Sequence, residues 1–277
     1  MVKKQTADVN CDARVSSLTK YAPMLCNLPN VVRVVAINFS GNTGKTTLCR
    51  HLLLPALPGA ELIRVESINN SGASTADLEV GGKDFEEVAR ALFAADRHTI
   101  VDIGASNVEL ARSVLHRLGD AHEEVELWVV PCVPAPAAQA KIYRDSIATL
   151  KELVLLGVNP ACIAVIKNKV LDVDSMDADF AEFVGAARAM NCIVIDRPVL
   201  EFDVYSDLDQ RPGSLDEIAA DSTNYRAVMK AARAAGKGEE AAYAMDAEFR
   251  RKNARTALSN LEQVRNDLFR VLTTVAA

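Results

Sequence analysis

Residues 40–47, SGNTGKTT, combine two glycines, a lysine and three hydroxyl-bearing threonines in one short segment. The segment follows a run rich in valine and isoleucine and precedes a stretch with a helical pattern. Glycine lets a backbone curl around a bulky anion with its N–H groups turned inward. A helix that begins there directs its positive end at the same place. The segment therefore predicts a site for phosphate groups, and a glycine-rich turn with no ligand is the plain alternative.

The side chains of this segment suit different parts of a nucleoside triphosphate. Lys45 offers a point charge to the β- and γ-phosphates, the Thr46 hydroxyl suits Mg²⁺, and Thr47 is placed for the α-phosphate. Gly41 and Gly44 allow the tight turn. The expected phosphate-binding residues are Gly41, Asn42, Thr43, Gly44, Lys45, Thr46 and Thr47.

The elements that must position this loop alternate along the chain as strand and helix patterns. The strand-like runs are nearly continuous in valine and isoleucine, which is typical of strands covered on both faces. They lie at 33–39, 61–66, 98–104, 124–131, 162–168 and 192–196. Helical patterns follow the lysine loop and recur at 83–96, 107–119, 136–157 and 177–190. We expect an α/β fold, a mainly parallel twisted sheet with helices on both faces and ligands outside the carboxyl ends of its strands.

Three regions are expected along the chain: an N-terminal extension at 1–30, a core at 31–212, and C-terminal helices at 213–277. The C-terminal helices are predicted at 214–236 and 239–275. The second carries an apolar stripe made of Phe249, Leu258, Leu261, Val264, Leu268, Val271 and Leu272. We expect this stripe to pack against the sheet, and a helix that binds a partner or a second copy is the alternative.

The composition is that of an ordinary globular chain: 277 residues, 49% hydrophobic, 25% charged, with a net charge of −6. No apolar run approaches the ~20 residues of a membrane span, and the N-terminal residues lack the apolar segment of a secretory signal. A cytoplasmic protein without a transmembrane segment is expected. The six cysteines contain no CxxC pair, which argues against a disulfide framework or a zinc site.

One short segment is basic within this acidic chain. Residues 223–238 contain four cations and no acid, namely Arg226, Lys230, Arg233 and Lys237. Such a segment is ordinarily a solvated helix face, and contact with DNA or with acidic lipid is the alternative.

The loop resembles the deviant Walker A motif of the ParA/MinD family, K-G-G-x-G-K-T-T. The usual P-loop pattern would have glycine at position 39, where this chain has Phe39. Asn42 stands at the second glycine of the family motif, and Ser40 stands at its first lysine. In the family that lysine reaches the nucleotide of a partner subunit. The resemblance implies ATP, Mg²⁺ and a possible homodimer, although Ser40 cannot make the lysine's contact.

Further matches to the family lie at the ends of other strands. Asp102 and Gly104 in VDIGASN resemble switch II, and Glu66 stands where the family carries an acid that orients water. Asn168 matches an amide that reads the adenine edge, and Pro198 matches a proline beside the base. The resemblance implies Lys45, Asp102 and Glu66 as catalytic residues, and Thr46 and Asp102 as holders of Mg²⁺.

Within the family, the segments INFSGNTGKTT, RVESIN and VDIGASN look most like StbB-type plasmid stability ATPases. That likeness implies a role in plasmid partition or positioning before conjugation, with a small DNA-binding partner protein from the same operon. Two alternatives stay open: a P-loop kinase or synthetase for a small metabolite, and a nucleotide-binding module without hydrolysis. Candidates for an activating charge in trans are Arg64, Arg112 and Arg197.

Overall fold

The computed structural model describes residues 31–66, 78–81, 92, 96–104, 108–134, 140–210 and 213–275. The predicted extension at 1–30 and nearly all of the predicted helix at 83–96 lie outside these residues.

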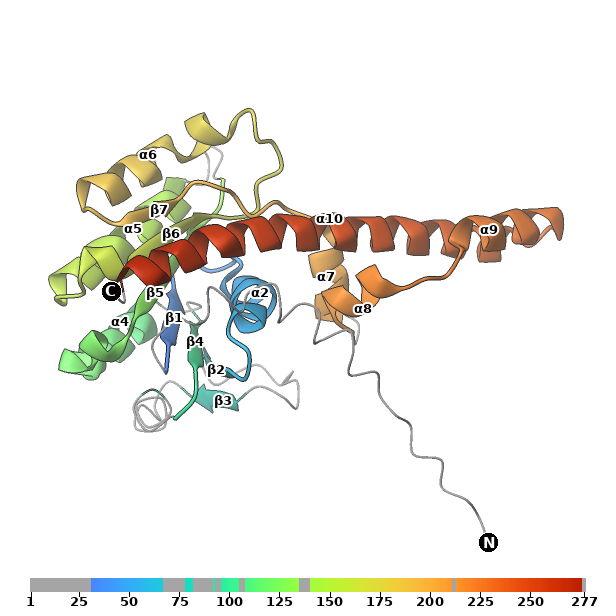
Figure 1. The fold of residues 1–277 in the computed structure, drawn as a ribbon. Coiled ribbons are helices and arrows are strands. Elements are labelled where there is room, and N and C mark those ends of the chain that lie inside the picture. The colour runs from blue at the N-terminus through green and yellow to red at the C-terminus, as the bar shows by residue number, and fades with distance from the viewer. Residues whose placement is uncertain are drawn as a thin grey trace, which may run out of the picture.

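One parallel sheet of seven strands forms the centre of the molecule, in the order β3-β2-β4-β1-β5-β6-β7 (Figure 1). The strands are β1 (Arg33–Ile37), β2 (Glu61–Glu66), β3 (Leu78–Gly81), β4 (Thr99–Ile103), β5 (Leu127–Cys132), β6 (Ile163–Lys167) and β7 (Ile193–Ile195). Every pair of neighbouring strands is parallel. The parallel sheet is therefore confirmed, with β3 as a strand that the sequence did not predict. Its four residues, LEVG, are too few to give a strand pattern.

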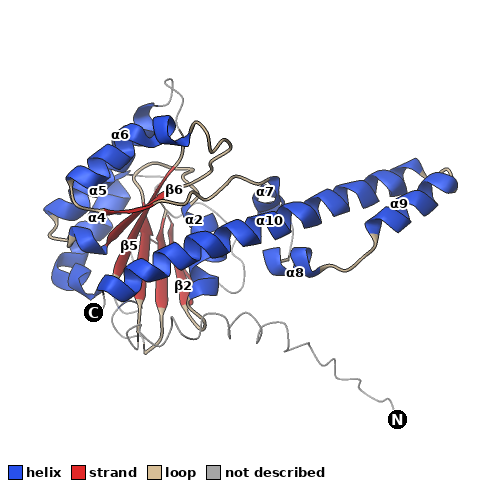
Figure 2. Ribbon diagram, turned by 45° about the horizontal axis from the view of Figure 1, so that its top comes forward, coloured by secondary structure: helices blue, strands red, loops and turns tan. Residues whose placement is uncertain are grey.

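Helices cover both faces of the sheet, as predicted (Figures 1 and 2). They are α2 (Lys45–Leu48), α4 (Val108–Leu118), α5 (Ala140–Leu155), α6 (Met176–Ala189), α7 (Asp203–Gln210), α8 (Leu215–Ala220), α9 (Tyr225–Ala234) and α10 (Gly238–Val275). Short π and 3₁₀ turns continue α2 to Ala56. Alternate residues of β1 face the two sides, because successive strand side chains point in opposite directions. Val35 joins the core beneath α4, α5 and α6, whereas Val34 joins the core beneath α2 and α10.

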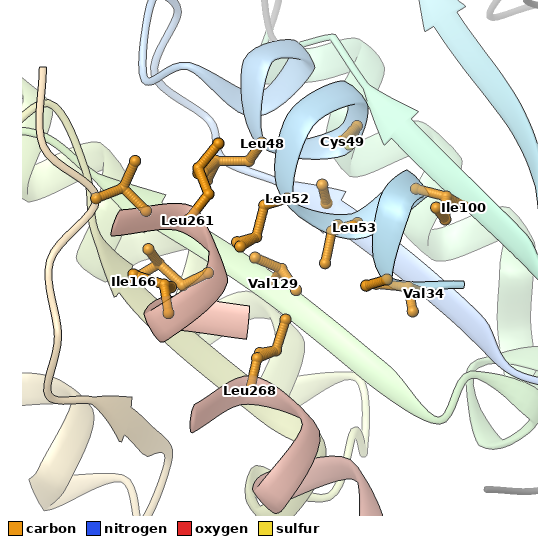
Figure 3. Close-up of a cluster of buried hydrophobic side chains, with 14 of the residues drawn as sticks. Val34, Leu48, Cys49, Leu52, Leu53, Ile100, Val129, Ile166, Leu261 and Leu268 are labelled. Carbon is orange, nitrogen blue, oxygen red and sulfur yellow. The ribbon is translucent and has the colours of Figure 1, made fainter. Parts of the chain in front are cut away.

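Only the C-terminal part of α10 packs on the sheet domain. Leu261 and Leu268 are buried against side chains that follow the loop, such as Leu52 (Figure 3). Phe249, in contrast, is 57% exposed, so the prediction that it belongs to the buried stripe is wrong. The reason is geometric: the N-terminal part of α10 extends past the sheet, which therefore cannot cover Phe249 (Figure 2).

The prediction of a single helix at 214–236 is also wrong, since two helices, α8 and α9, occupy this range. α8 begins at a capping box in which Ser214 and Glu217 satisfy each other's backbone N–H groups. The segment DSTN at 221–224 then separates it from α9, which is capped by Asn224. Asp, Ser, Thr and Asn favour turns and caps over helix interiors, because their side chains compete for backbone hydrogen bonds.

α9 packs back along α10, and the two project from the sheet domain (Figures 1 and 2). We call α9, the turn after it and residues 238–253 of α10 the arm. Small residues line the contact between the two helices: Ala232, Ala241, Ala244 and Ala247 are buried. Of the helices in the described residues, none has the length and apolar character needed to cross a membrane.

Candidate phosphate-binding site

The loop at 40–47 lies between β1 and α2, at the carboxyl end of a central strand. Two residues of the loop adopt left-handed backbone conformations, Asn42 with φ 58° and Gly44 with φ 78°. Asparagine is among the few residues other than glycine that tolerate this conformation. α2 begins directly afterwards at Lys45. The strand, turn and helix thus follow one another as the sequence predicted.

Polar side chains fix the entry to the loop from β1. Asn38 is fully buried, and its Nδ2 donates to Ser146 Oγ at 2.8 Å and to a carbonyl at the end of β5 at 2.6 Å. Asn38 Oδ1 accepts from the N–H of Ser40 at 2.7 Å. Thr149 Oγ1 accepts from the N–H of Phe39 at 2.9 Å. α5 and β5 therefore hold the first residues of the loop.

The sequence pattern does not predict this group of positioning residues. The partners of Asn38 and Phe39 lie 93 to 110 positions away along the chain. The available signal was local: Asn38 interrupts the apolar run at 33–39, and Ser146 and Thr149 fall one helical turn apart in α5. Both hydroxyls are fully buried, so their polarity is used inside the protein.

Two residues after β6 fix the other side of the loop. Asn168 is buried, and its Nδ2 donates to the backbone oxygen of Thr43 at 2.7 Å. Lys169 Nζ donates to Asn42 Oδ1 at 3.1 Å. The amide predicted to read an adenine edge thus lies beside the loop and supports it. Its contact with a base stays a prediction.

Gly44 is required for two separable reasons, a positive φ and the close approach of Asn168. A Cβ added at Gly44 would lie 2.4 Å from Asn168 Nδ2. Gly59 has a similar φ of 80° but nothing within 4 Å of its added Cβ, so it is a matched control. We expect Gly59→Ala to lower the free energy of unfolding by about 1–2 kcal/mol. Gly44→Ala should lower the free energy of unfolding by about 1 kcal/mol or more beyond the loss in Gly59→Ala, because the Asn168 side chain must give up its hydrogen bond to Thr43.

Urea unfolding of the two variants checks this prediction. Equal losses of stability in Gly44→Ala and Gly59→Ala would contradict it, because they would show that only the backbone conformation matters.

The Lys45 side chain is enclosed by the loop. Only 7% of the residue is exposed, and Nζ lies 3.2 Å from the carbonyl oxygen of Ser40 and 3.4 Å from that of Asn38. Carbonyl oxygens on one side orient the ammonium group without neutralising its charge. The lysine therefore places a buried positive charge within the loop, where an anion would meet it.

The half-buried Thr46 and the buried Asp102 form a hydrogen-bonded pair beside this lysine. Thr46 Oγ1 donates to Asp102 Oδ2 at 2.6 Å, and Asp102 is 1% exposed. Burial raises the pKa of the Asp102 carboxyl, while the Thr46 hydrogen bond and the charges of Lys45 and Arg64 act in the opposite direction. Asp102 Oδ1 has no hydrogen-bond partner among the described residues. A hydroxyl and a carboxylate with a free oxygen are the hard ligands that Mg²⁺ prefers, so these residues fit that ion.

The remaining predicted site residues lie along the same edge of the sheet. Glu66 is the last residue of β2, and Gly104 follows β4, the strand next to it. The N–H of Gly104 donates to the carbonyl of Val65 at 2.9 Å, which joins the two strand ends. Thr47 is in the first turn of α2. The rest of both predicted switch segments, 67–77 and 105–107, lies outside the described residues.

α10 fixes the segment that contains Pro198. Asn260 Nδ2 donates to the carbonyl of Pro198 at 3.0 Å, and Asn260 Oδ1 accepts from the N–H of Leu200 at 2.9 Å. The N–H of Val199 donates to the carbonyl of Lys167 at 2.8 Å, which places this segment beside the end of β6. α10 therefore supports one rim of the candidate site, a role that its sequence pattern does not indicate.

The three arginines considered as activating charges all contact their own chain. Arg197 Nε lies 3.1 Å from Asp267 Oδ2 on α10. The Arg112 guanidinium lies 5.4 Å from the centre of the Phe39 ring. Arg64 pairs in register with Asp102 across β2 and β4. A charge supplied to a second subunit by any of them stays a prediction.

This arrangement defines a doubly wound α/β protein with a strand–loop–helix of the P-loop type at its central strand. Neither a protein-family model nor a curated protein matches the chain. Among solved structures, apo McdA from Cyanothece matches with a TM-score of 0.44 and 14% identity, over 82% of this chain and 99% of that one. An ATP complex of a substituted Cyanothece McdA matches with a TM-score of 0.48 and 13% identity, over 87% of this chain and 97% of that one.

Proposed function

We propose that this protein is a Mg²⁺-dependent ATPase whose nucleotide state controls its association with a partner. One observation carries the proposal: a buried lysine and a Thr–Asp hydrogen bond with a buried aspartate meet at a loop with two left-handed residues. Lys45, Thr46 and Asp102 come from α2 and β4, and the hydrogen bond between Thr46 and Asp102 joins these elements directly. Neither a plain turn nor a core packing role requires this combination.

Each of these residues has a distinct task in the proposed site. The N–H groups of the loop and of the start of α2 bind phosphate oxygens, and Lys45 balances their charge. Thr46 and Asp102 hold Mg²⁺, which neutralises phosphate charge when it is bound. Glu66, at the end of β2, orients the attacking water in this proposal. In this proposal Asn168 contacts the edge of the base and Pro198 lies beside the base. Adenine is favoured because the KNK segment lacks the aspartate of a guanine-reading NKxD motif.

Turnover is expected to be slow in the isolated protein. Ser40 replaces the lysine that the ParA/MinD family inserts into a partner subunit, and Arg197 is paired with Asp267. We therefore propose that an associated macromolecule raises the rate. The likeness of the loop and switch segments to StbB-type proteins supports plasmid stability or positioning as the process served. A small DNA-binding protein of the same operon is the proposed partner.

Calorimetric titration of ATP with and without Mg²⁺, together with phosphate release, tests this function. We expect ATP binding that Mg²⁺ strengthens, and slow phosphate release. Absence of ATP binding would overturn the proposal. Binding without turnover, even with plasmid DNA and the operon partner present, would identify a nucleotide-binding module. Turnover only in the presence of a small metabolite would identify a kinase or synthetase.

A further inference from the structure

The arm carries a row of cations along one side of α9. Arg226, Lys230 and Arg233 follow one another at spacings of four and three residues, so they fall within about 60° of each other around the helix. All three are exposed. Lys237 continues the row in the turn before α10, with its side chain 64% exposed.

α10 contributes apolar side chains to the same side of the arm. Met245, Phe249 and Lys252 follow one another at spacings of four and three residues and so share one face of the helix. Met245 is 40% exposed and Phe249 is 57% exposed. Glu248 joins this face to α9, because its carboxylate lies 4.0 Å from Arg226 and 3.9 Å from Lys252. We call these side chains the arm face: Arg226, Lys230, Arg233, Met245, Phe249 and Lys252.

The arm differs in charge from the rest of the molecule. Residues 223–253 contain seven cationic and four acidic side chains, a net charge of +3 in a chain whose total is −6. The side chain of Glu248, which borders the arm face, is only 15% exposed and is also paired with Arg251. Asp246, one turn before Phe249, is an exposed acid at the edge of this face. The arm face therefore offers positive charge around two exposed apolar groups. Neither apolar group is needed to hold α9, because the buried alanines make that contact.

We propose that the arm face binds an acidic amphipathic helix of a partner protein. Such a helix would cover Met245 and Phe249 with its apolar side and pair its carboxylates with the surrounding cations. A nucleic acid backbone would satisfy the cations but leave a phenyl ring and a thioether in water. A second copy of the arm carries the same positive charge and would be repelled. The inference names a partner class for the proposed ATPase, yet it rests on the arm alone and is independent of nucleotide binding.

Designed peptides of about 18 residues, or five helical turns, provide the probe. One has leucines at helical spacing with glutamates elsewhere, a second has lysines in place of the glutamates, and a third has serines in place of the leucines. Fluorescence anisotropy without nucleotide measures their binding to the full chain, next to a mixed-sequence 20-base-pair DNA duplex. We expect the acidic amphipathic peptide to bind at least about tenfold more tightly than either other peptide.

Two variants, each altered at exposed side chains, separate the contributions of charge and apolar contact. Phe249→Ser should weaken binding of the acidic peptide about tenfold, and the double variant Lys230→Glu, Arg233→Glu should weaken it at least as much. Val228→Ser is the matched control, because Val228 is 37% exposed on α9 but lies about 200° around the helix from Arg226. Circular dichroism verifies that each variant keeps its helices.

The proposal is overturned if none of the peptides binds at about 100 μM, or if the acidic and basic peptides bind alike. It is also overturned if the DNA duplex binds more tightly than the acidic peptide and Phe249→Ser leaves that binding unchanged, since the surface would then be a phosphate-binding one. Because no nucleotide is present, failure here leaves the proposed ATPase untouched. Failure of ATP binding likewise leaves this result intact.

Discussion

Lys45→Ala is expected to abolish measurable ATP turnover and to weaken ATP binding by at least about a hundredfold, or about 2.7 kcal/mol. The ammonium group is enclosed by the loop and is oriented by the carbonyls of Ser40 and Asn38. Alanine removes the buried positive charge while leaving the backbone of α2 intact, because alanine is a strong helix former. Calorimetry for binding and phosphate release for turnover measure the two effects.

Lys141→Ala is the matched control for this experiment. Lys141 is exposed in the first turn of α5, so its removal changes the net charge equally without touching the loop. We expect its ATP affinity to equal that of the unaltered protein. If Lys45→Ala also kept its affinity and turnover, the loop could not be the triphosphate site.

Asp102→Asn is expected to separate stability from activity. Asparagine can still accept the hydrogen bond from Thr46, but it removes a carboxylate from a site that is 1% exposed. We expect the nucleotide-free variant to be about 1 kcal/mol more stable than the unaltered protein, because the cost of burying an ionised group is gone. Its Mg²⁺-dependent turnover should be lost, because the remaining amide is a poor ligand for that ion.

The pH dependence of this stability difference gives a further check. Burial raises the pKa of Asp102 above its ordinary value of 3.8, so the folded protein binds a proton more readily than the unfolded chain. As pH falls through the folded-state pKa of Asp102, the free energy of unfolding of the unaltered protein therefore rises relative to that of Asp102→Asn. The advantage of the variant should be greatest at neutral pH and vanish below the ordinary value. Urea unfolding across this range measures it, and a less stable variant at neutral pH would contradict the argument.

The strands of the core were predictable because burial on both faces leaves a nearly continuous apolar run. The run at 61–66 coincides with β2, and the others differ from the observed strands at one or both ends. β3 was not predicted because four residues are too few to establish a strand pattern. The break at 221–224 was present in the sequence as DSTN, but the apolar periodicity on either side of it obscured the two separate caps.

The phosphate loop could be predicted because its residues are consecutive in the chain. Asp102 and Asn168 were also expected near it, because their segments resemble motifs of the ParA/MinD family, and both lie at the carboxyl ends of parallel strands. The supports of the loop could not be predicted in this way. Asn38 meets Ser146 across 108 positions, and Asn260 meets Pro198 across 62, so only the folded chain brings them together.

α10 connects the rim of the candidate site to the arm. One uninterrupted helix runs from the rim beside Pro198 to Gly238 at the far tip of the arm, a span of about 33 Å. α10 thus joins the rim of the candidate site to the arm through one continuous helix, which sets the distance between the two.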